Sequence, residues 1–445
     1  MKTSIAALTI CLFASSACAS RPAASSAEES TAAVNAEIAR LALASDSTAI
    51  ARKLRDACSD PATRMSCYES RLVPLATEGK VKLAMGALGQ LAPLDPDVRT
   101  DGHVYAHAIG IAAGQSTHDV AGAFTQCSES FQSGCYHGVI QAWFARLDSI
   151  GRRDANTLCQ PFRASDTLRW IRFQCVHGMG HGLTMLYKHD LRKGLQGCDL
   201  LDDLWDRQSC YGGAFMENIV NVTTPHHPAK ALAHDKPAQA KPEAGHEGHH
   251  MATTDGKGSS EVPFKAVDAS DMHYPCSKLS ERYLRSCYEM QTSVMLYHTR
   301  GDMAAAAKSC GSAPVAMRTV CYASLGRDIS SYSQQKHPEA IRMCSLAAER
   351  YQPWCYLGVV KNFIDLNARA SDGIAFCRNV PRDSNKQLCY SAVGEQILIL
   401  APALADRQRL CSSAEPAYLE ACHYGARVVS TPPPGLARVW KSVEE

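Results

Sequence analysis

Residues 321–332 read CYASLGRDISSY, and residues 355–366 read CYLGVVKNFIDL. Each stretch begins with Cys-Tyr and continues with residues whose apolar spacing favours a helix. Cys287, Cys321, Cys355, Cys389 and Cys422 follow one another at a nearly constant interval of about 34 residues. A fixed period of about 34 residues is typical of helix–turn–helix repeats that stack on one another. The spacing therefore predicts an all-α repeat fold.

The remaining cysteines predict a disulfide framework. Beyond the first 19 residues the chain has 18 cysteines, which fall into close pairs 8 to 16 residues apart. The rival pairing, about 23 residues apart, would staple the two helices within a repeat. One repeat, near residues 92–101, lacks both cysteines, and under the rival pairing this would leave four cysteines single. We therefore predict nine bridges between close neighbours. The predicted pairs are Cys58–Cys67, Cys127–Cys135, Cys159–Cys175, Cys198–Cys210, Cys276–Cys287, Cys310–Cys321, Cys344–Cys355, Cys377–Cys389 and Cys411–Cys422.

The composition and the first residues predict an exported protein. The chain has 445 residues, a net charge of +2 and 46% hydrophobic residues, which favours folded repeats and gives no case for a nucleic-acid partner. Residues 1–19 combine an early lysine, a short apolar core and small residues, as an export signal does. Cleavage after Ala19 is one alternative, and lipidation of Cys18, the only membrane contact expected, is the other. Either predicts a periplasmic or secreted protein, in which disulfides are stable.

One insertion divides the array. The segment between Cys210 and Cys276 is far longer than the roughly 23 residues expected from the period. The extra residues, 223–267, are rich in Pro, Ala, Lys, Gly and His and predict a disordered loop. The predicted organisation is therefore N-terminal repeats at 31–222, this loop, C-terminal repeats at 268–430 and a tail at 431–445 that covers the end of the array.

By its period and helix pattern, the chain resembles the tetratricopeptide-type α/α repeat superfamily, in a disulfide-stapled, exported version, over roughly residues 31–430. The resemblance implies a right-handed α/α solenoid. The usual signature residues of that superfamily are not evident, so only the architecture is carried over. The stretches GCYHGV, CVHGMGHG and CYGGAFMEN are also similar to a His/Gly motif set in bacterial proteins to which we assign no function.

Histidines recur at matching positions in three consecutive N-terminal repeats. Counting one period of about 34 residues back from Cys135 makes Asp101 the equivalent of a cysteine. His103, His137 and His177 then follow their reference residues by two positions. His107 and His181 lie one helical turn further, so we expect five imidazoles to converge. Glycines cluster around them, as they do where neighbouring backbones approach closely.

The histidine columns predict a transition-metal site. Two His at i,i+4 on one helix bind a divalent ion, and Met216 and Glu217 are close enough in sequence to complete the shell. A methionine thioether near the histidines favours copper, whereas a carboxylate near them favours zinc or iron. The predicted metal ligands are His103, His107, His137, His177, His181, Met216 and Glu217.

The favoured hypothesis is an exported metal-binding protein, with the His-rich loop capturing the ion. Two alternatives stay open. One is a metal-dependent hydrolase or oxidase that uses the same cluster, although the sequence identifies no catalytic residue. The other is an interaction scaffold that binds a protein or peptide on the solenoid surface, where the histidines line a groove.

Overall fold

The structure is a computed structural model that describes residues 26–164, 168–223 and 264–443. The predicted export signal, Cys18 and residues 224–263 of the predicted loop lie outside this part of the chain. Within it, all regular structure is helical and no strand is present, so the all-α prediction is confirmed. None of the helices there is both long and apolar enough to cross a membrane.

Short and long helices alternate along most of the chain. The α-helices are α1 (Ser26–Leu43), α2 (Ser47–Ala57), α3 (Arg64–Thr77), α4 (Val81–Leu91), α5 (Pro96–Gln115), α6 (Val120–Phe124), α7 (Gly134–Phe144), α8 (Arg152–Leu158), α9 (Arg169–Leu186), α10 (Leu191–Cys198), α11 (Leu204–Thr223), α12 (Glu281–Tyr288), α13 (Gln291–Thr299), α14 (Met303–Ser312), α15 (Val315–Tyr332), α16 (His337–Cys344), α17 (Gln352–Asn367), α18 (Ala370–Asn379), α19 (Asp383–Leu400), α20 (Leu404–Cys411), α21 (Leu419–Gly425) and α22 (Pro434–Lys441). Single 3₁₀ turns are η1 (Gln160–Arg163), η4 (Cys276–Lys278), η5 (Glu349–Tyr351) and η6 (Pro416–Tyr418).

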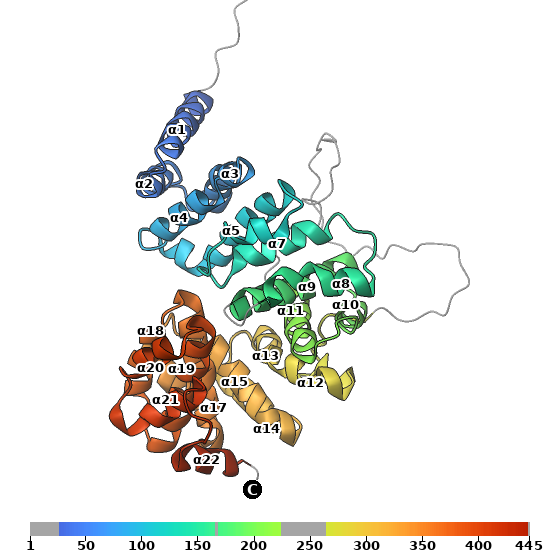
Figure 1. The fold of residues 1–445 in the computed structure, drawn as a ribbon, viewed down its shortest axis with the longest axis vertical. Coiled ribbons are helices and arrows are strands. Elements are labelled where there is room, and N and C mark those ends of the chain that lie inside the picture. The colour runs from blue at the N-terminus through green and yellow to red at the C-terminus, as the bar shows by residue number, and fades with distance from the viewer. Residues whose placement is uncertain (1–25, 165–167, 224–263, 444–445) are drawn as a thin grey trace, which may run out of the picture.

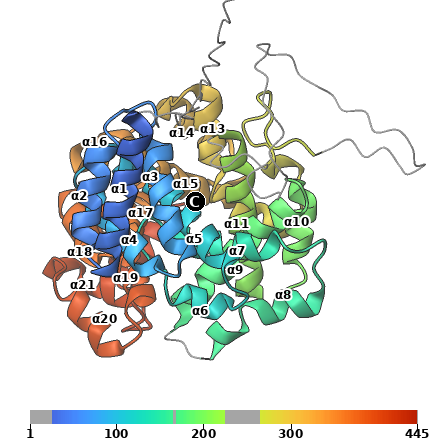
Figure 2. The same cartoon turned by 90° about the horizontal axis from the view of Figure 1, so that it is seen from above.

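From α1 at the top, the helices up to α11 descend the long axis of the molecule in chain order, whereas α17–α21 lie to the left of α12–α15 at about the same level, with α22 at the bottom (Figure 1). Seen from above, α1–α4 lie on the same side as α18–α21, and α8–α11 lie on the opposite side (Figure 2). The chain therefore turns around the long axis as it descends. This turn brings α19 into contact with α9.

Glycines set the closest contacts between long helices. A Cβ atom placed on Gly110 of α5 would lie 2.0 Å from the carbonyl oxygen of Cys135 in α7. A Cβ atom on Gly138 of α7 would lie 2.2 Å from the carbonyl oxygen of His107 in α5. Since no side-chain carbon fits at either distance, the two backbones touch through a reciprocal pair of glycines. We call this arrangement a glycine joint.

The glycine joint recurs at three other pairs of packed helices. In each joint the first helix contributes a glycine five residues after its cysteine, and the second contributes one three residues after its own. The glycine–carbonyl contacts are Gly180–Cys210 and Gly213–His177 between α9 and α11, Gly326–Cys355 and Gly358–Ala323 between α15 and α17, and Gly394–Cys422 and Gly425–Ser391 between α19 and α21.

The joint also defines the register of the repeat without cysteines. Gly110 must follow its reference residue by five positions, so Tyr105 takes the place of the cysteine, and not Asp101. The interval from Cys67 to Tyr105 is then longer than the period and the interval from Tyr105 to Cys135 is shorter, so the period holds only as an average here. His107 is thus the equivalent of His137 and His177, and His103 lies one turn earlier. The predicted histidine register was wrong by one helical turn on α5.

All nine predicted disulfides are present. Their Cα–Cα distances of 5.4 to 5.9 Å are ordinary for a bridge. Eight of the bridges tie the end of a short helix, or the residues just after it, to the α-helix that follows, and Cys276 in the 3₁₀ turn η4 is bridged to α12. By the loop-closure argument, a bridge of this size stabilises the fold by about 3 kcal/mol.

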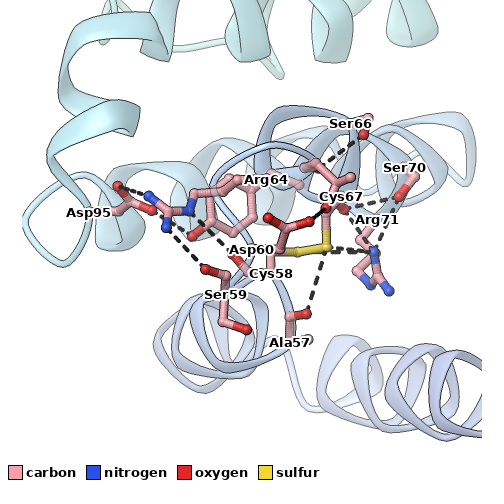
Figure 3. Close-up of a disulfide and its surroundings, with 12 residues drawn as sticks. Ala57, Cys58, Ser59, Asp60, Arg64, Ser66, Cys67, Ser70, Arg71 and Asp95 are labelled. Carbon is pink, nitrogen blue, oxygen red and sulfur yellow. Dashed lines mark hydrogen bonds and ion pairs between the residues drawn. A yellow bond between two sulfur atoms is a disulfide. The ribbon is translucent and has the colours of Figure 1, made fainter. Parts of the chain in front are cut away.

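In the repeat without cysteines, the buried carboxylate of Asp95 connects the start of α5 to α3. Asp95 precedes α5, is 5% exposed, and accepts hydrogen bonds from Tyr68 Oη at 2.8 Å and from the first turn of α5. Arg64 lies 3.6 Å from the same carboxylate and donates through Nε to the carbonyl oxygen of Cys58 at 3.3 Å. Figure 3 shows Arg64 between Asp95 and the Cys58–Cys67 bridge. Polar contacts therefore connect this repeat to the preceding disulfide.

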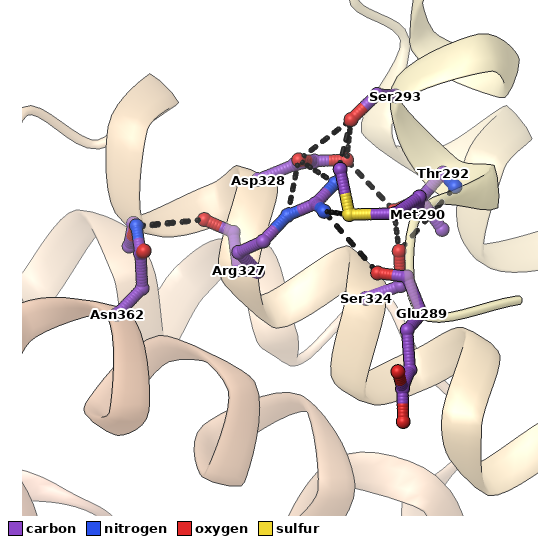
Figure 4. Close-up of polar contacts among 9 residues, drawn as sticks. Glu289, Met290, Thr292, Ser293, Ser324, Arg327, Asp328 and Asn362 are labelled. Atoms are coloured by element: carbon purple, nitrogen blue, oxygen red, sulfur yellow. Dashed lines mark hydrogen bonds and ion pairs between the residues drawn. The ribbon is translucent and has the colours of Figure 1, made fainter. Parts of the chain in front are cut away.

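The contact between α13 and α15 is polar. Thr292 Oγ1 lies 2.6 Å from Ser324 Oγ and donates to Asp328 at 2.7 Å (Figure 4). Arg327 Nη2 donates to Ser293 Oγ and to Asp328, both at 2.6 Å. Side chains therefore separate these two helices, whereas backbones touch at the glycine joints.

The C-terminal end of the predicted loop lies in the folded part of the chain. Phe264 and Val267, placed in the loop by the sequence, pack against the hydrophobic core. Phe264 stacks on Tyr274, with ring centroids 5.3 Å apart, and lies under the Arg192 guanidinium. In the tail, α22 packs against α19 and buries Leu436.

Substitution of one joint glycine by alanine tests the glycine joint. A Cβ at Gly358 would lie 1.9 Å from the carbonyl oxygen of Ala323, so Gly358→Ala forces α15 and α17 apart. We expect the free energy of unfolding in urea to fall by about 1–3 kcal/mol.

The control is Gly89→Ala, because Gly89 lies in α4 with no atom within 4 Å of its added Cβ. This change should stabilise the protein by about 0.5–1 kcal/mol through helix propensity alone. Equal effects of the two substitutions would contradict the joint.

Candidate functional site

The five histidines come together where α5, α7 and α9 pack side by side. Each imidazole lies 5.8 Å or less from at least one other, measured between ring centroids. The distances are 5.8 Å for His103–His107, 5.7 Å for His103–His137, 5.2 Å for His137–His177, 5.1 Å for His137–His181 and 5.2 Å for His177–His181. The prediction that these side chains converge is confirmed. We call the five rings the histidine cluster.

The cluster is buried, and burial determines its charge. His137 is 3% exposed and His181 is 4% exposed, whereas His103 is half-buried at the edge. Burial, reinforced by the neighbouring imidazoles, holds the pKa of His137 well below its ordinary value. The same causes lower the pKa of His177 to about 3. These two rings are therefore neutral at physiological pH.

The ring nitrogens make hydrogen bonds to separate partners. His103 Nδ1 donates to the carbonyl oxygen of Phe131 at 3.0 Å. His137 Nε2 donates to Gln174 Oε1 at 3.1 Å, and Gln174 is itself buried. Sequence reasoning missed Gln174, although it directly precedes Cys175 on the histidine helix.

Glu217 on α11 contacts one side of the cluster. Its Oε2 accepts a hydrogen bond from His181 Nδ1 at 2.9 Å, and Gln141 Nε2 lies 3.5 Å from the same oxygen. Its other oxygen lies 4.0 Å from His189 Nδ1. The prediction that Glu217 belongs to this site is thus supported by one direct contact. Met216, its neighbour, is half-buried and packs against the hydrophobic core.

The predicted metal site is wrong. In the described part of the chain, no group of three or more His, Cys, Asp or Glu side chains is arranged to hold a metal ion. The imidazoles lie against one another, and their nitrogens bind a carbonyl, an amide and a carboxylate in three different places. His103, His107, His137, His177, His181, Met216 and Glu217 therefore do not form the predicted copper, zinc or iron centre. The alternative hypothesis of a metal-dependent hydrolase or oxidase relied on the same residues and is therefore wrong as well.

A row of aromatic rings connects the cluster to the start of α9 and α11. Phe173 stacks on His177 with centroids 5.3 Å apart, and its other neighbour, Trp205, is 6.1 Å away. The Arg169 and Arg172 guanidinium groups lie over the Trp205 ring, 5.0 and 5.2 Å from its centroid. Sequence reasoning missed this group because it compared positions after Cys175 and Cys210, whereas these residues precede the two cysteines.

Comparison of the chain with protein-family models, with curated proteins and with solved structures of other proteins finds no match. The function must therefore be argued from the residues themselves.

The buried histidines predict a pH-dependent stability. An unfolded histidine titrates near 6.5, and His177 in the folded chain titrates at about 3. Between these values the unfolded chain binds a proton that the folded chain does not. The contribution of neutral His177 to the free energy of unfolding is therefore fully present above pH 6.5. It is lost as the pH falls toward 3, with a slope of up to about 1.4 kcal/mol per pH unit.

Urea unfolding between pH 7 and pH 4 measures this slope. His177→Leu should flatten it, whereas His118→Leu, at an exposed position, should not. Parallel pH profiles for wild type and His177→Leu would show that His177 ionises freely in the folded state.

Proposed function

We propose that this protein is an interaction scaffold of the helical-repeat type that acts in an oxidising compartment, in the periplasm or outside the cell. Nine disulfides support the compartment, because such bridges persist where thiols are not kept reduced. The consecutive packing of its long helices supports a right-handed α/α solenoid with repeats of about 34 residues, similar to the tetratricopeptide type. Such arrays present extended surfaces to partner proteins.

The observation that carries the proposal is the surface where Arg169 and Arg172 cover Trp205. Tryptophan and arginine are the residue types that contribute most to binding at protein interfaces. Leu204, beside Trp205, leaves 62% of its side chain exposed. An apolar anchor beside an arginine–tryptophan group fits a protein partner, and a net charge of +2 gives no support to a nucleic-acid partner. We call these four residues the partner surface.

A buried carboxylate orders the partner surface before binding. Asp206 is fully buried, and its Oδ1 lies 2.7 Å from Arg172 Nη2, while Arg163 pairs with its other oxygen. Because Arg172 is already held against the Trp205 ring, its side chain loses little further entropy when a partner contacts it. Rigid arginines of this kind favour specific binding.

Site-specific photo-crosslinking in cells tests the proposal. A photoreactive amino acid at position 204 should capture one partner protein, and the same group at exposed Leu404 on α20 should not. With the purified partner, Trp205→Ala should raise the Kd about 10- to 100-fold, as loss of a strongly contributing interface residue does.

Gln408→Ala, at an exposed position on α20, is the matched binding control and should leave the Kd unchanged. The same products from positions 204 and 404, or an unchanged Kd for Trp205→Ala, would refute the partner surface.

A further inference from the structure

Two of the rings in the histidine cluster each have a buried nitrogen without a hydrogen-bond partner in the described part of the chain. These nitrogens are Nδ1 of His137 and Nε2 of His181. The two rings stack at 23° with centroids 5.1 Å apart, so both nitrogens belong to one small region between α7 and α9. A buried polar atom without a partner is costly, and a bound water or ligand with a hydrogen-bonding group removes that cost.

The contacts on the opposite side of each ring determine what these nitrogens can bind. His137 Nε2 donates its hydrogen to Gln174 Oε1, and His181 Nδ1 donates its hydrogen to Glu217. In a neutral imidazole the second nitrogen is then a lone-pair acceptor. His137 Nδ1 is therefore an acceptor, and His181 Nε2 is one in the neutral form of its ring. Their ligand must supply N–H or O–H donors.

The charge around the two acceptors favours a cation. Glu217 accepts from His181, and a carboxylate in that position makes the opposite nitrogen a stronger acceptor. No donor is offered to an anion by these two nitrogens, and the carboxylate would repel one. The ring of Phe173, which stacks on His177, adds an aromatic face of the kind that attracts a positive charge.

We propose that His137 Nδ1 and His181 Nε2 form a binding site for a primary ammonium group, with Glu217 as the neighbouring carboxylate. An ammonium is compact and carries three donors, so it suits two acceptors on rings this close. A carbon chain attached to it would extend toward the half-buried His103 edge of the cluster. The ammonium belongs to a free alkylamine or to a lysine side chain of another protein.

This inference goes beyond the proposed scaffold function, because it uses buried rings and needs none of the residues of the partner surface. The Trp205→Ala variant should keep ammonium binding while it loses the partner protein. The two proposals therefore fail separately.

Titration of the full chain, with its disulfides formed and a metal chelator present, tests the site. The probes are n-butylammonium and, as the matched control, tetramethylammonium, which has the same charge and no N–H donor. With histidine ¹⁵N labelling, n-butylammonium should shift the signals of His137 Nδ1 and His181 Nε2 saturably. Tetramethylammonium should bind at least tenfold more weakly.

Variants of His137 provide a second test. His137→Asn keeps an oxygen acceptor near the Nδ1 position and should bind n-butylammonium within about tenfold of wild type. His137→Leu removes the acceptor and should abolish binding, whereas His118→Leu should change nothing.

A peptide with one lysine separates the two sources of the ammonium. Binding as tight as that of n-butylammonium indicates a lysine side chain, and weaker binding indicates a free amine. Equal binding of the two ammonium probes, no shift with either, or a signal explained by an internal water alone would overturn the proposal. The comparison of the two ammonium probes on the wild-type protein tests the proposal even if the His137 variants do not fold.

Discussion

The architecture depends on one contact, the glycine of one long helix against a backbone carbonyl of the next. At four pairs of helices this contact is made twice, in opposite directions, so the two backbones lie as close as they can. Two of the carbonyls covered by glycine are those of His107 and His177. Gly138 thus brings α7 against α5 at His107, and Gly213 brings α11 against α9 at His177. The ring of His107 lies beside His103 on its own helix, and the ring of His177 lies beside His137 on α7. Two residues of the histidine cluster therefore lie at the closest points between helices.

The same joints occur without histidines in the second half of the chain. There the carbonyls covered by glycine belong to Ala323 and Ser391. In each half the first cysteine-bearing long segment, α3 or the α12–α13 pair, has no glycine joint, and two glycine-joined pairs follow. The backbone arrangement therefore does not require imidazoles. What distinguishes the first half is the set of side chains at equivalent positions, and this difference supports a specific role for them.

The sequence was sufficient for the helical fold and for every disulfide, because the cysteine spacing repeats and the repeat without cysteines excludes the rival pairing. It was also sufficient to bring the five histidines together. The position of His103 was misjudged because Asp95 fixes the start of α5 without a bridge, and this lengthens one interval and shortens the next. The metal hypothesis failed because spacing places imidazoles near one another but does not orient their nitrogens. Gln174 and Glu217 determine that orientation, and only the packed helices show it.

The disulfides form a series of separate small rings, since each of the nine bridges closes before the next begins. No ring encloses or crosses another, so the nine disulfide loops follow one another along the oxidised polypeptide without overlap. During synthesis and export, each disulfide can form as soon as its own two cysteines are available, before the C-terminal half of the chain is complete. A repeat without its two cysteines also leaves no stray thiol elsewhere, as in the segment around Asp95. Covalent modularity of this kind lets repeats be lost, altered or specialised one at a time.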